Sequence, residues 1–371
     1  MSENAVAMPR PKLAPWQAKN TARTLQIVLA SVLPSVIAVL IGVFLALDPA
    51  VVLLIVFLPL QILSSGLVGF RFYGRRGVSD SILIIFTIFF SALVGVLLLS
   101  VLYSVVSNGL KALSPQFILQ NNVYITDTTS LEYGGVGHAI LGTVIMVGLT
   151  TLVTVPLGIT LAVYLTETRS KSRGLVRTLV QAMSGLPSVV AGLFVYAALI
   201  MTGVMKFSGI LGSIALIPLM LPTVARVAEE GLRLVPVELR NGALALGAPA
   251  YRAFFQVTLP AARTAIVTAL LLGIARVIGE TAPLLLTTGY VSNTNLNPFD
   301  SMIGIPSYIY SNLLSANDTS AQRAWGAAFV VLIFVGVLFT AVRLATRDRK
   351  AKKPSKSPKA AATQIDLKAG K

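Results

Sequence analysis

The sequence of 371 residues contains no cysteine and one histidine, and charged residues make up only 12% of it. Without cysteine the chain forms no disulfide and no thiolate metal site, and it has no cysteine nucleophile. The lone His138 leaves little for a zinc site. The sequence also lacks a nucleotide-binding loop with Gly-Lys-Ser/Thr, a His-Glu-x-x-His motif and a Ser/His/Asp set. We therefore do not expect an enzyme, and we do not expect this chain to hydrolyse ATP.

Apolar residues dominate what is present: they make up 55% of the chain, and its mean hydropathy is +0.81. This composition lies outside the range of soluble globular domains and predicts an integral membrane protein. A helix of about 20 apolar residues crosses a hydrocarbon core of roughly 30 Å. On this criterion we predict an all-α, polytopic helical bundle with about eight transmembrane helices. The predicted spans are residues 25–47, 51–70, 81–106, 139–166, 176–204, 209–225, 264–288 and 325–345.

The net charge of +16 is distributed unevenly between the two sides of these spans. With the amino terminus in the cytoplasm, 26 of the 30 Lys and Arg residues lie in cytoplasmic segments. Lys111, Lys206 and Arg323 lie outside, and Arg276 lies within a span. This asymmetry is what the positive-inside rule requires, and it predicts cytoplasmic N- and C-termini. Because the excess charge is spread over every cytoplasmic segment, nucleic acid is not an expected partner.

The two ends of the chain are polar and lie outside the predicted spans. Residues 1–24 form a cytoplasmic segment, and because no cleavage site follows them, the first helix is expected to remain as an anchor. Residues 347–371 are rich in Lys, Ala, Ser and Pro and are too polar to bury a core. We predict a disordered basic cytoplasmic tail there; binding to anionic lipid headgroups is a further possible role for it.

The seventh predicted span carries two charges, Arg276 and Glu280. A charge at the centre of a membrane helix costs about 2.5 to 3.5 kcal/mol on insertion-based scales, and ion pathways and relays are the usual reason for it. In a continuous helix the two residues differ by about 40° and share a small, polar face with Gly273, Gly279 and Pro283. The helix rise places them about 20 Å and 26 Å from the cytoplasmic end. This face is predicted to point into the bundle and toward a partner subunit.

Three roles for Arg276 and Glu280 stay open from the sequence. The two can form an ion pair that only fixes helix packing, they can line the substrate pathway, or they can form a gate that breaks between two states. An arginine suits an oxyanion because its planar guanidinium donates two parallel hydrogen bonds and stays protonated when desolvated. A neighbouring carboxylate then serves as its counter-ion and keeps the contact with substrate transient.

The cytoplasmic segment between the sixth and seventh spans, residues 226–263, is much longer than a turn between antiparallel helices needs. Its pattern predicts a helix from Val237 that ends at Gly247, followed by a second short helix over 251–256. The glycine fixes the bend between the two helices. A rigid helix pair that projects from the membrane is typical of a docking site for a soluble partner.

Within this segment Gly247 is followed, after nine residues, by Val257-x-Leu259-Pro260. This spacing resembles the coupling loop of ABC importer permeases, written EAA...G.........I.LP, which inserts into a groove of the ATPase subunit. The head of the motif departs from the family, because Asn-Gly-Ala stands where Glu-Ala-Ala is usual. Glu238, one helical turn earlier, is an alternative source of the carboxylate. The resemblance implies that the ATPase-coupling residues are Glu238, Arg240, Asn241, Gly242, Ala243, Gly247, Leu259 and Pro260.

Further motifs are spread over residues 81–345. They are GGVGHAILGT at 134–143, PLG at 156–158 leading to YLTE at 164–167, LPSVVAGLF at 186–194, ARVIGETAPLL at 275–285 and IPSYIY at 305–310. Together they resemble phosphate ABC transporter permeases, and the PstA-type subunit more closely than its PstC-type partner. The resemblance implies a six-helix permease domain over 81–346, preceded by two additional transmembrane helices in 25–80.

The resemblance also implies a function and partners. The chain is expected to be a permease subunit of an ATP-driven importer of inorganic phosphate in the bacterial cytoplasmic (inner) membrane. Expected partners are a PstC-type second permease, PstB-type ATPases, an extracytoplasmic PstS-type phosphate-binding protein and membrane lipid. No cofactor is expected on this chain, because ATP binds to the ATPase. The alternatives are an ABC permease for a different solute, or a gradient-driven transporter or channel that works through Glu280 without an ATPase.

Two candidates on the outer side carry weaker signals. His138 stands at the mouth of the fourth span, where it is either a spacer residue or a group that titrates near physiological pH. Gly134, Gly135 and Gly137 form either a tight turn or an anion-binding backbone nest. Aromatic and apolar side chains of the outer loops either pack at the membrane interface or contact a binding protein; these loops are residues 107–137 and 289–324.

Overall fold

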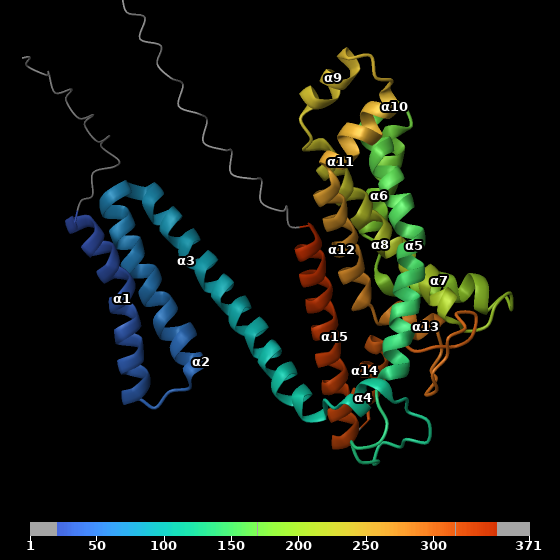
Figure 1. Ribbon diagram of the computed structural model, residues 1–371. Coiled ribbons are helices and arrows are strands. Elements are labelled where there is room, and N and C mark those ends of the chain that lie inside the picture. Colours follow the sequence, from blue (N-terminus) through green and yellow to red (C-terminus); the bar gives the residue numbers. More distant parts are fainter. Residues whose placement is uncertain (1–20, 169, 316, 347–371) are drawn as a thin grey trace, which may run out of the picture. The chain divides into compact units, whose positions relative to one another are not determined.

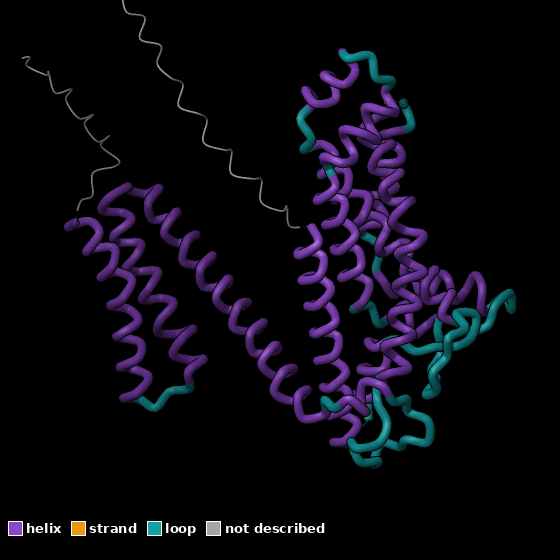
Figure 2. The backbone as a smooth tube through the Cα atoms, in the orientation of Figure 1, coloured by secondary structure: helices purple, strands orange, loops and turns teal. Residues whose placement is uncertain are grey.

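The computed structural model describes residues 21–168, 170–315 and 317–346. Within these ranges the chain is helical and contains no strand, as Figure 1 and Figure 2 show. The chain folds as two compact units, which divide between Leu102 and Tyr103. The predicted basic tail and nearly all of the predicted N-terminal segment lie outside the described residues. The predicted start of the permease domain after residue 80 stays a prediction.

The first unit consists of apolar helices joined by tight connections. Asp48 begins the second helix by accepting a hydrogen bond from the Ala50 amide at 2.8 Å, and Pro49 fits the first turn, where no N–H donor is needed. The last helix breaks at Gly74, whose φ of 64° is readily adopted only by glycine. The elements are α1 (Thr21–Phe44), α2 (Pro49–Val51), the π-helical η1 (Val52–Phe57) and α3 (Leu58–Ala112), which continues into the second unit.

Polar side chains and glycines bring the helices of the first unit together. The Ser64 hydroxyl and the Gln61 amide both donate to the Ala30 carbonyl oxygen of α1, at 2.8 and 3.4 Å. Gly69 and Gly77, on either side of the break in α3, lie so close that neither has room for a Cβ. Interhelical hydrogen bonds and small residues are the usual means of helix association in membranes. The chain of α3 therefore folds back on itself at Gly74.

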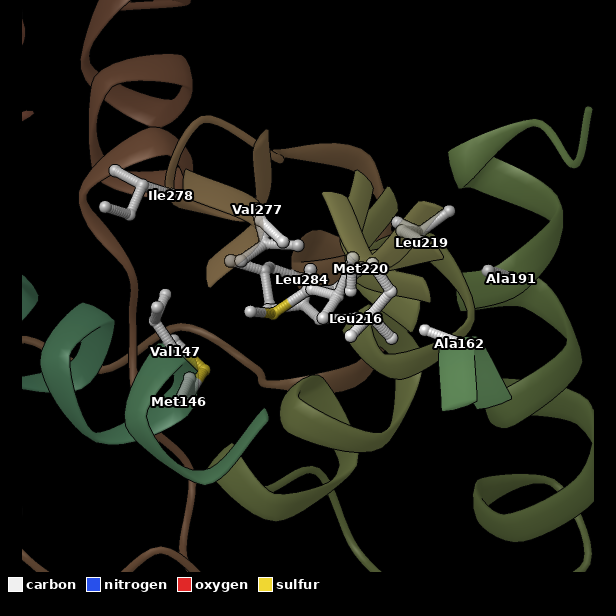
Figure 3. Packing of buried hydrophobic residues seen from close by; sticks show 14 of the residues in the cluster. Met146, Val147, Ala162, Ala191, Leu216, Leu219, Met220, Val277, Ile278 and Leu284 are labelled. Carbon is white, nitrogen blue, oxygen red and sulfur yellow. The ribbon is translucent and has the colours of Figure 1, made fainter. Parts of the chain in front are cut away.

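The second unit is built around helices whose apolar faces meet. α5 and α8 form its most extensive helix pair, α12 packs on α8, and α14 packs on α15. In Figure 3, Met146 of α5, Leu216 of α8 and Val277 of α12 belong to one buried cluster. The bounds are α4 (Pro115–Leu119), α5 (Gly137–Glu167), α8 (Gly209–Arg233), α12 (Arg263–Ile278), α14 (Ile305–Leu313) and α15 (Asp318–Thr346).

Four of the predicted spans coincide with single helices that are long and apolar enough to cross a membrane, namely α1, α5, α8 and α15. Two more, 51–70 and 81–106, lie in one apolar run, Pro49–Ala112, on either side of the break in α3. By length and composition, the described residues contain five candidate spans, or up to seven if each sharply bent helix pair is one span. The total of eight therefore stays a prediction.

The predicted spans 176–204 and 264–288 are not continuous helices. In the first, α6 is followed by α7, which continues as the π-helical η2, and the two halves are bent by 99°. In the second, the helix ends at Ile278 and a short helix follows after Thr281. The segments are α6 (Arg173–Ser184), α7 (Ser188–Val195), η2 (Tyr196–Ile200) and α13 (Ala282–Thr287).

Glycine and proline account for both breaks. Gly185 ends α6, and Pro187 disfavours a helical conformation for the residue before it. Pro283 has no N–H group to donate to the carbonyl four residues earlier, which belongs to Gly279, itself a poor helix former. The expectation of one helix across 264–288 is wrong because these two residues interrupt its hydrogen-bond ladder.

Candidate functional site

The break between α12 and α13 places the two charged residues of this region in different surroundings. Arg276 lies in the last turn of α12 and is exposed, whereas Glu280 lies in the link between the helices and is half-buried. The link is short, and the Glu280 amide still donates to the Val277 carbonyl at 3.2 Å. Only Arg276 is therefore presented by a regular helix.

The exposed side of α12 forms a stripe that ends at the break. Exposed residues recur there at every fourth position, so they line one side of the helix. They are Thr264, Thr268, Leu272 and Arg276. An arginine is unfavourable against lipid and in membrane proteins usually faces a bundle interior or a water-filled cavity. The exposed stripe therefore marks the side of α12 that suits a second subunit or a polar path.

The predicted small, polar face of this region is wrong. Gly273 is buried against α8 and Pro283 is buried against Gly192 of α7, without room for a Cβ on either glycine. Gly279 is exposed, with no atom near the position of a Cβ. These residues do not share one face for two reasons. The helix ends before Gly279, so Gly279 and Pro283 do not continue its periodicity. Within the helix, Gly273 lies three residues before Arg276 and therefore points about 60° away from it.

The described part of the chain shows no ion pair between Arg276 and Glu280. A pair four residues apart needs a continuous helix to bring both side chains to one face, and the helix ends between them. An ion pair within this helix therefore receives no support. The pathway and gating roles stay predictions, as does pairing with a residue of another subunit.

A second broken helix lies against the first. α7 begins after Pro187 and packs on α13, and the backbone of Gly192 in α7 touches Pro283 in α13. Figure 1 shows α7 and α13 at the same level of the second unit, with α7 running across the direction of α5. In many transporters, substrate and ion sites are formed where helices are discontinuous. The candidate functional site is therefore the region of the two breaks, with Arg276 as its exposed cation.

The segment after α8 forms the helix, glycine turn and second helix that the sequence predicts. Gly247 ends the first helix with a φ of +84°, in the left-handed region. Figure 1 shows this segment at the opposite end of the second unit from α4 and α14. The coupling segment, as we name it, consists of α9 (Val237–Ala245), α10 (Ala250–Ala253), the π-helical η3 (Phe254–Thr258) and α11 (Leu259–Ala261).

The coupling segment presents apolar side chains to its surroundings. None of the nine residues of α9 is buried, and Leu246 just after it is 92% exposed. Tyr251 and Phe255 are 61% and 62% exposed. Exposed apolar patches on a polar rim are typical of protein interaction sites. Of the predicted coupling residues, the exposed ones are Glu238, Asn241, Gly242, Gly247 and Pro260, and the half-buried ones are Arg240, Ala243 and Leu259.

One ion pair connects the coupling segment to the core. Arg240 of α9 pairs with Glu167, the last residue of α5. The two side chains are 33% and 20% exposed. The sequence places Glu167 in the YLTE motif, just after the fourth predicted span, but does not indicate its pairing with Arg240. The ion pair therefore joins α9 directly to the end of α5.

At the other end of the second unit, Arg323 is buried and forms a clamp. Its guanidinium donates to four carbonyl oxygens of the loop before α5, at 2.9 to 3.4 Å. Asp127 of the same loop accepts hydrogen bonds from Ser315 and Ser320, at 2.8 and 3.2 Å. The sequence predicts only that Arg323 lies in the outer loop before the eighth span and gives it no role. The four carbonyls belong to Thr126, Thr129, Ser130 and Tyr133.

The glycines at the start of α5 form a tight turn. The amides of Gly134, Gly135 and Gly137 all donate within the loop, at 2.9 to 3.2 Å, so they are not free to bind an anion. The nest hypothesis is wrong for this reason. His138 is buried, and its ring lies edge-on to Tyr308, with the ring centres 5.6 Å apart. Burial raises the pKa of Tyr308 to about 12, so its hydroxyl stays protonated at physiological pH.

Comparison with known proteins identifies the family. Residues 154–348, more than half of the chain, match the binding-protein-dependent transport system inner membrane component. The chain belongs to this family. The matched residues of this inner membrane component include both broken helices and the whole coupling segment, whereas the first unit precedes them. The role of such a component is transport.

Several relatives of this inner membrane component carry a more specific description. The phosphate transport system permease protein PstA 1 of Mycobacterium tuberculosis (strain ATCC 25618 / H37Rv) is 41% identical, over 58% of this chain and 72% of the relative. The probable phosphate transport system permease protein PstA of Methanocaldococcus jannaschii is 34% identical, over 68% and 88%. The phosphate transport system permease protein PstA of Haemophilus influenzae is 32% identical, over 76% and 98%.

Proposed function

We propose that this chain is a permease subunit of an ATP-driven importer of inorganic phosphate. The observation that carries the proposal is the identity of 32% to 41% with relatives described as phosphate transport permeases. The Haemophilus influenzae relative is covered over 98% of its length, so the similarity extends over a whole permease and not only over one motif.

The substrate pathway runs along the exposed stripe of α12. Arg276 at the end of the stripe offers phosphate a planar, permanently charged donor group, and the half-buried Glu280 limits how long the anion stays. A second permease subunit of the PstC type faces this stripe and completes the path. The breaks before Pro283 and Pro187 allow α13 and α7 to move relative to α12 and α6.

The coupling segment docks on a PstB-type ATPase, which binds the ATP. The exposed apolar side chains of α9 and α10 suit a groove on that partner, and the ion pair between Arg240 and Glu167 passes its movement to α5. This chain itself holds no cofactor. A permease for a different solute uses the same machinery, and a transporter without an ATPase leaves the exposed coupling segment without a purpose.

The orientation follows from the charges of the sequence. Both termini and the coupling segment lie in the cytoplasm, and the loops 107–137 and 289–324 lie outside, where a PstS-type binding protein delivers phosphate. The helices in 25–80 form an addition to the permease domain over 81–346, and the tail 347–371 is cytoplasmic. The lipid bilayer surrounds the apolar surfaces of both units.

Uptake of radiolabelled phosphate into proteoliposomes that contain the purified complex tests this function. Uptake is expected to require ATP, to survive collapse of ion gradients and to persist in excess sulfate. Arg276→Ala is expected to lower uptake by about tenfold or more, because one charge-assisted contact in a desolvated site carries this much. Arg276→Lys is expected to retain part of the activity.

The control for this test is Lys206→Ala, which removes an exposed cation outside the proposed pathway and is expected to leave uptake within about twofold. Unchanged uptake by Arg276→Ala contradicts the pathway and gating roles of Arg276. Uptake that needs an ion gradient and no ATP contradicts the importer itself, and loss of phosphate uptake in excess sulfate indicates another solute.

A further inference from the structure

A second polar site lies between α6 and the last turns of α8. The two helices line a cavity of about 450 Å³. Three arginines and two glutamates line it, namely Arg177, Arg226, Arg233, Glu229 and Glu230. We propose that this cavity binds a phosphoryl group, either of an anionic phospholipid headgroup or of free phosphate.

The carboxylates of the cavity are already engaged, which leaves positive charge in excess. Glu229 Oε1 accepts from Arg177 Nη2 at 2.7 Å and from Arg233 Nη2 at 2.6 Å. Glu230 accepts from the Arg226 Nε at 3.3 Å. Each guanidinium has five N–H donors, and these ion pairs use one nitrogen of each. Unused donors of three cations are therefore available to a further anion, which phosphoryl oxygens satisfy with short, charge-assisted hydrogen bonds.

The depth of the cavity matches the headgroup layer of a membrane. α8 has 25 residues. At the helix rise it spans about 37 Å, against roughly 30 Å for the hydrocarbon core. Its last turns therefore emerge where lipid phosphates lie. Basic pockets between transmembrane helices on the cytoplasmic side are known to hold anionic headgroups. The assignment to the cytoplasmic side rests on the proposed orientation, whereas the cavity and its charges do not.

Apolar residues form part of the cavity beside its arginines. Leu165 and Val180 are buried and belong to its lining. The exposed Leu175 and Leu179 lie on the opposite side of α6 and do not line the cavity. A phospholipid headgroup and free phosphate offer these arginines the same phosphoryl chemistry, and a binding measurement separates the two sources.

The cavity is distinct from the proposed substrate pathway. All of its lining residues belong to α5, α6 and α8, and none belongs to α12 or α13. Its arginines are only partly exposed in the ion pairs with Glu229, at 38% for Arg177 and 50% for Arg233. A phosphoryl group bound here bridges α6 and α8, and thereby fixes the half of the broken helix that precedes Pro187.

Native mass spectrometry of the full-length chain, purified in detergent, tests the proposal. Phosphatidylglycerol, phosphatidylcholine and inorganic phosphate are titrated separately. Phosphatidylglycerol or inorganic phosphate is expected to bind, and phosphatidylcholine is expected to bind at least about tenfold more weakly than phosphatidylglycerol, because its headgroup carries no net charge. Arg177→Gln with Arg233→Gln is expected to weaken binding by about tenfold or more. A preference for phosphatidylglycerol over inorganic phosphate assigns the lipid as the source, and the reverse preference assigns free phosphate.

Two further variants keep the test interpretable. Arg226→Gln removes the most exposed arginine, whose partner Glu230 is itself 65% exposed, so the fold is expected to hold while binding weakens about threefold or more. Arg75→Gln with Arg76→Gln removes two exposed charges outside the cavity and serves as the matched control. Equal binding by all variants, or an equal loss in the control, overturns the proposal. This experiment measures binding and not uptake. A negative result therefore contradicts the phosphoryl site without contradicting the proposed import function.

Discussion

The two ends of the second unit hold their loops in different ways. At one end, which we call the outer end after the proposed orientation, Arg323 donates to four loop carbonyls, and Asp127 accepts from Ser315 before α15 and from Ser320 in its first turn. At the other end, the described residues show one ion pair, between Arg240 and Glu167, that connects α9 to a core helix. The loop before α5 is thus held by a buried side chain, whereas α9 lies on the surface of the second unit and has no buried residue.

The difference fits the tasks that we propose for the two ends. A loop clamped by many hydrogen bonds of a buried charge keeps one shape, because leaving any of these groups unpaired is costly. A helix with no buried residue and one partly exposed ion pair leaves its position to a partner. We therefore expect substitutions at the outer end to lower stability the most, and those in the coupling segment to lower coupling more than they lower stability.

The largest effect is expected from the loss of the buried charge at the outer end. Arg323→Met leaves four carbonyls without their donor and is expected to lower the free energy of unfolding by about 3 kcal/mol. The midpoint temperature of thermal unfolding, followed by the fluorescence of the nearby Trp325, is expected to fall by roughly 6 to 12 °C. Lys111→Met, at an exposed position, is the control. A shift as small as that of the control contradicts the clamp.

The next effect is expected at the turn of the coupling segment. Gly247→Val forces a branched residue into a φ of +84°, which costs about 1 to 3 kcal/mol and distorts the turn. Co-purification of the ATPase and ATP-driven uptake are both expected to fall about fivefold or more.

Gly174→Ala is the control for this turn. Gly174 lies within α6, outside the coupling segment, and a Cβ there meets nothing, so the substitution is expected to favour the helix by about 1 kcal/mol and to leave coupling intact. If Gly247→Val keeps both ATPase binding and uptake, the docking role of this segment is wrong.

A pH effect is expected at the outer end. The folded-state pKa of Tyr308 is raised to about 12, above its usual value of 10.0, so its contribution is complete below pH 10 and is lost as pH rises toward 12. At pH 11 the loss is about 1 kcal/mol. Tyr308→Phe is expected to flatten this part of the stability profile, measured by thermal unfolding between pH 9 and 12. An unchanged profile rules out Tyr308 as the titrating group.

The smallest effect is expected from the ion pair of α9. Because the side chains of Arg240 and Glu167 are partly exposed, a double-mutant cycle is expected to give about 0.5 to 1 kcal/mol. Arg240→Glu is expected to lower phosphate transported per ATP more than it lowers thermal stability, and Glu167→Arg in the same chain is expected to restore that ratio. A double variant that remains as uncoupled as the single one shows that the contact plays no part in coupling.

Local features of the sequence were enough for several elements. Long apolar runs predict α1, α5, α8 and α15, because a membrane span must satisfy its own backbone hydrogen bonds over a fixed length. The bend at Gly247 follows from the need for a left-handed residue after α9. The break at Gly279 could also have been predicted, because Pro283 lacks the N–H group that a continuous helix requires. Hydropathy alone does not predict this break, because the segment is apolar on both sides of it.

The sequence by itself determined that this is a helical membrane protein, that long apolar runs form α1, α5, α8 and α15, and that a bent helix pair follows α8. These features depend on composition and on neighbours within a turn or two of helix. Only the tertiary structure decided that Arg323 is a buried clamp, that Arg240 pairs with Glu167, and that Gly273 faces α8 while Arg276 does not. Such contacts join residues up to almost two hundred positions apart, and no local periodicity records which helices come to lie side by side.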